Sequence, residues 1–213
     1  MDSIMRATEP LTTKEFFALD VDERLKVELI GGALVTHTAD PLTADDFFAF
    51  GLDKKLKAEL IGGALVVRAS SKPWHGRVAN RLARHLEDVL GDQFAVFTDL
   101  GVIVDEENVP QPDVFVIRRS HDPDRVTEAS DVLLAVEIMS SGSRVYDRLV
   151  KPSLYRDAGI PSWRIERSGR HLALFDIPLR GDYQTQLGQV TLKVAGIDVP
   201  IDLEAIVAYA LGV

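Results

Sequence analysis

Two acidic residues stand where a carboxylate could bind a metal ion. Asp113 follows Gln111 and Pro112 at the start of a β-like run, and Glu137 interrupts the apolar run 132–139. Burying an ionised carboxylate in such an apolar setting is costly, so either neutralisation or a cation is expected, and carboxylate oxygens favour Mg²⁺ or Mn²⁺. A metal bound there would activate water for hydrolysis. Alternatively, Glu137 lies near the end of its strand and pairs with an arginine, and spacing alone leaves both interpretations open.

Lys151 is a third candidate, because it lies on a predicted helix directly after the strand that carries Glu137. Asp147, Lys151 and Tyr155 are four residues apart and therefore share one face of this helix. An ammonium beside a metal-bound water could orient that water or stabilise the negative charge of the transition state. The alternative is a surface pair between Asp147 and Lys151, worth only about a few tenths of a kcal/mol.

The remaining charged residues indicate where nucleic acid could bind. His75 could contact a metal or a phosphate, although a histidine at the start of a helix more often forms a local hydrogen bond. Three arginines on one side of the same helix are best interpreted as its solvated face: Arg77, Arg81 and Arg84. Residues 144–170 hold seven basic and three acidic residues, a net of +4 in a chain of net charge −9. We therefore expect any contact with a nucleic-acid backbone to be local to this segment.

Composition excludes several other classes of protein. The chain has 213 residues, enough for one buried core, and 46% hydrophobic and 27% charged residues, as in globular proteins. It has no cysteine, which excludes disulfides and thiolate metal sites and suits a cytoplasmic protein. No apolar run approaches the ~20 residues that a membrane-spanning helix needs. Sequence motifs of P-loop, zinc-protease and serine-hydrolase sites are absent.

A repeat dominates the first third of the chain. Residues 11–35 return as residues 42–66, at an offset of 31. Each copy predicts a short helix, capped by Thr12 or Thr43, followed by a strand that is entered or broken at its glycines. Two copies are too few for a solenoid, so a local duplication is the better explanation. We expect residues 1–41 to form an N-terminal extension with the first copy, and residues 42–213 to form the main domain.

The rest of the sequence predicts the elements that must position the candidate residues. Apolar spacing predicts helices at 73–90, at 143–158 with a kink at Pro152, and at 203–211. Short β-like runs occur at 94–98, 102–105, 114–117, 132–139, 163–166, 172–176, 183–187 and 190–194. The order predicts an α/β or α+β domain, in which a mixed central sheet is flanked by helices.

Several blocks together resemble one family. ELIGGALVVRASSKPWH, VPQPDVFVI, LLAVEIMSSGS, DRLVKPSLYRDAGIP and WRIE, in this order, are similar to the bacterial Uma-two family of putative restriction endonucleases. The resemblance implies a PD-(D/E)XK nuclease core with Asp113 and Glu137 as metal ligands. It also implies that Lys151 is the catalytic lysine, moved onto the helix, and that Glu59 is a further metal or water ligand.

Two departures from the family pattern matter for the site. Met139 occupies the usual lysine position two residues after Glu137, so the assignment depends on Lys151 reaching in from the helix. The repeat offers two candidate acids, and Glu59 is favoured because it precedes His75 by 16 residues, the spacing that the family resemblance implies, whereas Glu28 has no such partner. The first copy could be an appended unit, cover a sheet edge or compete for the same place in a domain swap.

The sequence therefore predicts a Mg²⁺- or Mn²⁺-dependent endonuclease that cleaves phosphodiester bonds in DNA. A homodimer is expected from fold analogy, because restriction-like enzymes often pair two sites. The alternative is a catalytically inactive nuclease fold that binds nucleic acid or a protein. A third hypothesis is a structural, oligomerising protein with neither metal nor nucleic-acid affinity.

Overall fold

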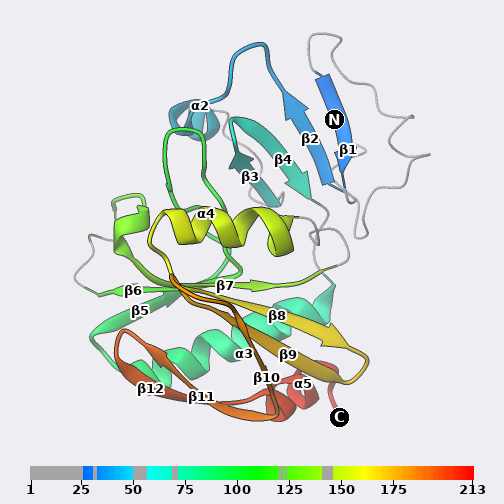
Figure 1. Cartoon of the computed structure of the whole chain (residues 1–213), viewed down its shortest axis with the longest axis vertical. Helices are drawn as coiled ribbons and strands as arrows, with labels where there is room; N and C mark the ends of the chain where they lie inside the picture. The colour runs from blue at the N-terminus through cyan, green and yellow to red at the C-terminus, as the bar shows by residue number, and fades with distance from the viewer. Residues whose placement is uncertain are drawn as a thin grey trace.

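A six-stranded mixed sheet forms the centre of the protein (Figure 1). The computed structural model describes residues 26–30, 33–49, 57–68, 72–119, 122, 124–140 and 146–213. Within these residues the sheet order is β10-β9-β8-β7-β6-β5, and only β7 and β8 are parallel. The bounds are β5 (Phe94–Phe97), β6 (Val114–Arg118), β7 (Val132–Ile138), β8 (Ser162–Ser168), β9 (His171–Ile177) and β10 (Gln184–Leu187).

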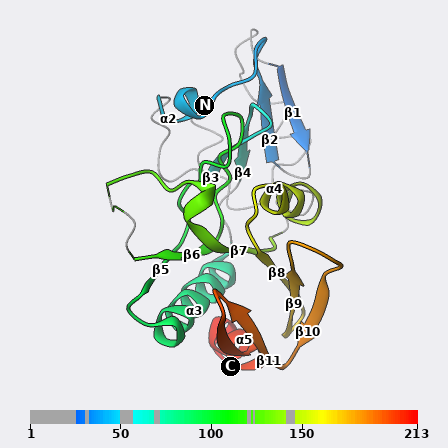
Figure 2. The ribbon, with the colours of Figure 1, turned by 60° about the vertical axis from the view of Figure 1, so that its left-hand side comes forward.

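Helices cover both faces of this sheet, as the sequence predicts (Figures 1 and 2). One face packs on α3 (Pro73–Leu90), α5 (Leu203–Leu211) and the hairpin of β11 (Gln189–Val194) and β12 (Ile197–Asp202), and the other on α4 (Lys151–Asp157). Among the described helices, none is long and apolar enough to cross a membrane.

Alternation along β7 explains how one strand serves both layers. Leu134 and Val136 belong to the core under α3, whereas Ala135 belongs to the core under α4. On α3, Leu82 and Leu86 are fully buried, one helical turn apart. Truncating such a leucine to alanine costs about 2–5 kcal/mol, so this helix anchors the sheet.

A second sheet, formed by the two repeat copies, lies beyond α4 (Figure 1). Its described strands have the order β1-β2-β4-β3. Their bounds are β1 (Lys26–Ile30), β2 (Ala33–His37), β3 (Lys57–Ile61) and β4 (Ala64–Arg68). Each copy thus contributes a hairpin. The sequence predicted a strand that is either entered or broken at its two glycines. In the second copy the strand is broken there: Gly62 and Gly63 have φ of +56° and +69°, as a tight hairpin turn requires.

The helix of the second copy is capped as predicted. α2 (Ala44–Ala49) follows Thr43, whose hydroxyl accepts a hydrogen bond from the Asp46 amide at 3.2 Å. In return, the Asp46 carboxylate accepts from the Thr43 amide at 2.9 Å, which completes a reciprocal capping box. The corresponding helix of the first copy, with its cap at Thr12, lies outside the described residues.

Other predicted elements differ from the structure in ways that have physical causes. α3 and α5 have the predicted bounds. The strand predicted at 102–105 is wrong, because this segment makes only isolated bridges. The prediction omitted β12, which closes a hairpin with β11. The predicted helix at 143–158 is described from residue 146 as a π-helical turn, Tyr146–Val150, followed by α4; Pro152 lacks the amide hydrogen that regular helical bonding would need at this junction.

Candidate active site

Asp113 and Glu137 lie on adjacent strands and on the same face of the sheet. Val114 of β6 is paired with Val136 of β7 in antiparallel register, and one further step places Asp113 opposite Glu137. Residues directly opposite in such a pair have Cβ atoms about 4.5–5.5 Å apart. Both carboxylates are buried. The pairing of β6 with β7 therefore brings together the two acids that the sequence selected.

Asp113 is surrounded by groups that favour its ionised form. Its Oδ2 accepts a hydrogen bond from the Ile138 amide at 2.6 Å and lies 3.1 Å from His75 Nε2, and its Oδ1 contacts the Lys57 ammonium. Burial alone would raise the pKa of Asp113, but Lys57 and His75 hold it well below its ordinary value. Asp113 in turn raises the pKa of His75 despite the burial of the imidazole.

Glu137 receives its partners from the helix that follows its strand. Its Oε1 accepts hydrogen bonds from Lys151 Nζ at 2.9 Å and from the Tyr155 hydroxyl at 2.6 Å. Burial raises the pKa of Glu137 to about 7; Lys151 opposes this rise, and Asp147 and Asp113 add to it. The pairing is thus with a lysine and a tyrosine rather than with the arginine considered as an alternative.

Glu59 joins the same network from the other sheet. Its Oε1 lies 2.6 Å from Lys151 Nζ, so one ammonium is shared by Glu59 and Glu137. Arg68 contacts Glu59 Oε2 and also lies 3.2 Å from Asp147 Oδ1. Asp147 is 3.7 Å from Lys151 but is buried, so the surface pair considered as an alternative is excluded.

The buried charges of this network nearly balance. Among the described residues, its four carboxylates are Glu59, Asp113, Glu137 and Asp147, and its lysine and arginine side chains are Lys57, Arg68 and Lys151. With a neutral His75 the network lacks one positive charge. This deficit is consistent with the raised pKa of Glu137, and it leaves an electrostatic place for a proton or a further cation.

The donor set fits a hard metal cation through two carboxylates. Asp113 and Glu137 supply oxygen ligands of the kind that Mg²⁺ and Mn²⁺ prefer. Within the described part of the chain, no group of three or more histidine and acidic side chains is arranged to hold a metal ion. Glu59 and Glu137 instead share Lys151, and Lys57 occupies Asp113.

Two cations of the site escaped the sequence prediction. Lys57 and Arg68 lie opposite each other in the β3–β4 hairpin, on the face that carries Glu59. The repeated K-x-E pattern was a signal for Lys57, since Lys26 stands in the same relation to Glu28. His75, a secondary candidate, is at the site: its Nε2 lies 2.6 Å from the Ile138 carbonyl oxygen as well as near Asp113.

The two repeat copies place their equivalent acids in different surroundings. The Glu28 side chain is 41% exposed and lies 3.1 Å from His37, whereas the Glu59 side chain is 0% exposed. His37 and Arg68 are equivalent positions of the repeat. The acid–base pair is thus present in both hairpins, but only the second copy delivers it to the site.

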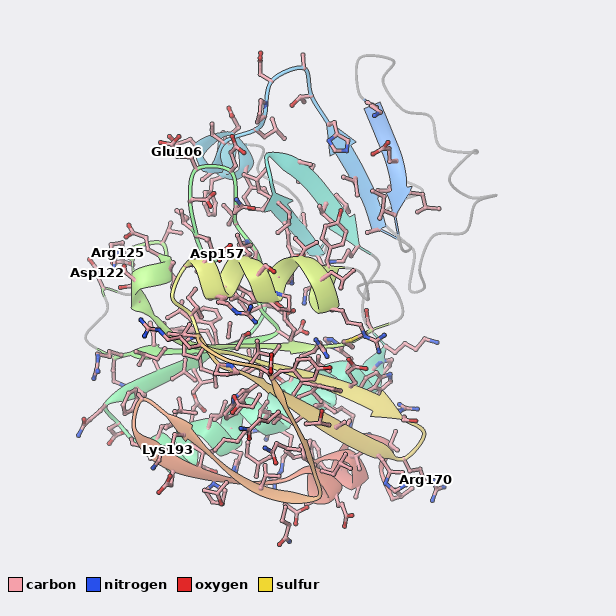
Figure 3. The ribbon with its side chains drawn as sticks, viewed as in Figure 1. Glu106, Asp122, Arg125, Asp157, Arg170 and Lys193 are labelled. Carbon is pink, nitrogen blue, oxygen red and sulfur yellow. The ribbon has the colours of Figure 1, made fainter. Side chains whose placement is uncertain are left out.

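Among the described residues of the predicted basic segment, the basic side chains do not all lie on one surface. Lys151 is fully buried, Arg164 lies 4.3 Å from the centre of the Phe175 ring, and Arg148 is paired with Glu166. Figure 3 shows Arg170 at the β8–β9 turn, far from Asp157 at the end of α4. The net charge of the segment therefore overstates its local attraction for a nucleic-acid backbone.

A cavity of about 360 Å³ opens beside the end of β7. Three of its lining residues are basic, and the Arg167 guanidinium lies 4.7 Å from the centre of the Trp74 ring. The lining residues are Lys72, Trp74, Met139, Ser140, Arg148, Glu166 and Arg167. Met139 is two residues from Glu137 and Trp74 adjoins His75 in the sequence, but none of the side chains that bind Asp113 or Glu137 lines this cavity.

A comparison with models of known protein families shows the family to which this chain belongs. The family model named Uma2, described as "Putative restriction endonuclease", matches residues 44–197, more than half of the sequence. The chain belongs to the Uma2 family. The matched region contains Glu59, Asp113, Glu137 and Lys151, and it excludes the first repeat copy. No curated protein matches the sequence.

A solved structure agrees with the fold expected of a Uma2 protein. The crystal structure of a putative nuclease belonging to DUF820 from Anabaena variabilis superposes with a TM-score of 0.61 at 14% identity. The likeness covers 80% of this chain and 99% of that one. It confirms the predicted restriction-endonuclease-like mixed sheet flanked by helices. The family and the fold together support a nuclease function.

Proposed function

We propose that this protein is a divalent-metal-dependent endonuclease that hydrolyses phosphodiester bonds in DNA. The observation that carries the proposal is the position of Lys151: although Met139 occupies the usual lysine position of the strand, Lys151 Nζ lies 2.9 Å from Glu137. A lysine on α4 thus stands beside the two acids of β6 and β7, where a nuclease of this class needs its positive charge.

Asp113 and Glu137 would hold the metal ion, Mg²⁺ or Mn²⁺, with Glu59 as a further ligand of the metal or of its water. A bound divalent cation lowers the pKa of water and neutralises charge on the phosphate. Lys57 would have to leave Asp113, and a second partner is already present, because its ammonium lies 3.0 Å from the more exposed Asp99. Exchange of Lys57 between these two aspartates would open Asp113 without stranding a buried cation.

Lys151 would stabilise the negative charge that develops on the phosphate. Its ammonium is held between Glu59 and Glu137, which would fix its position. Burial and Arg68 lower the pKa of Lys151, and Glu137 and Asp147 oppose this lowering. The Tyr155 hydroxyl, which donates to Glu137, would restrict that carboxylate to one orientation. Once Lys57 has left Asp113, these contacts would hold Lys151 and Glu137 in place during the reaction.

The cavity beside the end of β7 suits an unpaired nucleotide. Trp74 offers an aromatic surface on which a base can stack, while Arg148 and Arg167 supply positive charge at its rim. Its position next to Met139 would bring the phosphate of such a nucleotide towards Asp113 and Glu137. We propose that DNA approaches the site from this side.

Cleavage of supercoiled plasmid, with Mg²⁺, Mn²⁺ or EDTA, tests the proposal. Asp113→Asn and Glu137→Gln keep the shape of each side chain and should abolish metal-dependent nicking while leaving the fold intact by circular dichroism. Lys151→Met should lower the rate by about 100- to 1,000-fold, as for loss of one group that stabilises developing charge. Nicking that persists in EDTA, or that is unchanged in Asp113→Asn, would refute the assignment.

The repeat provides a matched control. Glu59→Gln and Glu28→Gln are the same substitution at equivalent positions of the two copies. Only Glu59 belongs to the buried network, so only Glu59→Gln should reduce cleavage. Equal effects of the two substitutions would show that the loss arises from a general disturbance of the hairpins.

An alternative is a nuclease fold that binds DNA or a protein without cutting. It is favoured by one observation: the carboxylates already have cationic partners within the chain, including Lys57 on Asp113 and Lys151 on Glu137. Calorimetric titration with Mn²⁺ separates the two functions, because the alternative predicts DNA binding by the wild type with neither metal affinity nor cleavage.

A further inference from the structure

The two hairpins of the N-terminal sheet pair through equivalent strands. β2 and β4 are the second strands of the two repeat copies, and they run antiparallel beside each other. Val35 lies opposite Val66, and these two valines are the same position of the repeat. The flanking pairs, Leu34 with Val67 and Thr36 with Leu65, are exchanged by the same equivalence. The contact is therefore pseudo-symmetric about the two valines, like an isologous dimer interface.

The side chains at this contact are also matched. Ala33 and Val35 of the first copy and Ala64 and Val66 of the second form one buried cluster, packed against Tyr146. The register inside each hairpin is the same as well, since five pairs of β1 with β2 recur 31 residues later in β3 with β4. Each copy thus presents the same strand, in the same register and with the same apolar face.

We propose that the edge of β4 that pairs with β2 is a self-recognition edge, suited to an identical hairpin, and that β2 of the first copy fills it in place of a second subunit. An open strand edge presents unpaired backbone groups that template pairing with another strand. A hairpin tethered to the same chain has a high effective concentration and outcompetes one on another molecule. A chain with both hairpins is then monomeric at this edge and has one candidate site per molecule.

This arrangement bears on the homodimer expected from the sequence. At the β4 edge, the two paired strands belong to one chain, whereas in a homodimer they would belong to two subunits. The extension predicted for residues 1–41 therefore contributes an interface and no second site, since the repeat contains no counterpart of Asp113 or Glu137.

Release of the first hairpin, with both copies present in the chain, tests the proposal. Val35→Asp places a carboxylate in the apolar cluster, which should detach β2 and expose β4. By light scattering, the wild type should have the mass of one chain at all concentrations, and Val35→Asp should form a concentration-dependent dimer. Adding Val66→Asp should return the protein to a monomer, because it destroys the edge itself. A folded Val35→Asp protein that stays monomeric would overturn the proposal.

Cysteine crosslinking tests the register, because the chain has no cysteine of its own. In a β4–β4 dimer, position 66 faces position 66, and opposite Cα atoms about 4.5–5.5 Å apart can be joined by a disulfide. Val66→Cys in the Val35→Asp background should therefore give a crosslinked dimer. Leu65→Cys in that background should give several-fold less, because position 65 faces position 67. Equal yields would contradict the symmetric pairing.

A further variant does not depend on releasing a strand. Val35→Cys combined with Val66→Cys should form a disulfide within one chain, seen as an oxidised monomer on a non-reducing gel. A dimer linked by these disulfides would overturn the proposal, because it would show hairpins exchanged between two subunits. None of these experiments measures nuclease activity. A failure of this proposal can therefore be distinguished from a failure of the proposed function.

Discussion

Glu137 should make the metal-free protein less stable as the pH rises from 4.5 to 7. Its pKa in the folded state is about 7, mainly because it is buried, against an ordinary value of 4.5. The folded state therefore binds this proton more tightly than the unfolded state, and deprotonation favours unfolding. At about 1.4 kcal/mol for each tenfold change in proton affinity, the loss across this range is about 3 kcal/mol.

Neighbouring groups act in other ranges or can be separated from Glu137. The pKa of Asp113 is held well below its ordinary 3.8, so its stabilisation is present above that value and is lost only in stronger acid. The pKa of His75 is raised above 6.5, so its stabilisation is complete below 6.5 and is lost as the pH rises through the higher folded value. In Glu137→Gln, the free energy of unfolding should no longer decline from about pH 4.5, and only the decline caused by deprotonation of His75 should remain.

Urea unfolding in EDTA at a series of pH values measures this effect. The free energy of unfolding of the wild type should fall by about 3 kcal/mol between pH 4.5 and 7, and that of Glu137→Gln should stay nearly level up to pH 6.5. A metal ion bound at Asp113 and Glu137 favours the ionised carboxylate, so Mn²⁺ should reduce the decline in the wild type. Identical pH slopes for the wild type and Glu137→Gln would refute the reasoning.

Three other predictions concern the site, the hairpin turn and the cavity. Lys151→Ala should lower the free energy of unfolding by about 3–5 kcal/mol, because it leaves buried carboxylates without their shared cation; a loss below about 1 kcal/mol in urea unfolding would contradict this. Gly62→Ala should lower the free energy of unfolding by about 1–2 kcal/mol, because alanine is strained in the left-handed conformation. Gly63→Ala should lower it further, because the added Cβ would lie 2.5 Å from Pro41 Cβ. Equal decreases in melting temperature for the two variants would argue against this contact. Trp74→Ala should weaken binding of a single-stranded oligonucleotide by about 1–3 kcal/mol in fluorescence anisotropy, and an unchanged Kd would remove the base-stacking role of the cavity.

The sequence predicted best what depends on local periodicity. α3 was predictable because Val78, Leu82 and Leu86 recur every four residues and are all fully buried. Asp113 at the start of one apolar run and Glu137 within another were candidates from their setting, but the residues alone left other interpretations open, and the family resemblance was needed to favour them. In contrast, the alternating apolar residues Val102 and Val104 suggested a strand that does not form.

The counterions of the site could not be predicted, because they depend on contacts between distant segments. Arg68 reaches Asp147 across 79 residues of sequence, and Lys57 reaches Asp113 across 56. Both contacts require the β3–β4 hairpin to dock beside α4, and no local pattern specifies this docking. Lys151 was predictable because it shares a helix face with Tyr155, and both side chains do reach Glu137.

Because β2 pairs with β4, the first repeat copy must keep its apolar residues but need not keep its charged ones. Ala33 and Val35 are held by packing, because a polar or bulkier replacement would disturb the shared cluster. Glu28, which lies outside the buried network, is under no such requirement and can drift without affecting the candidate site. The first copy has His37 where the same offset of 31 residues places Arg68 in the second. The first copy thus serves the fold through its apolar face, whereas the second also supplies charged side chains to the buried network.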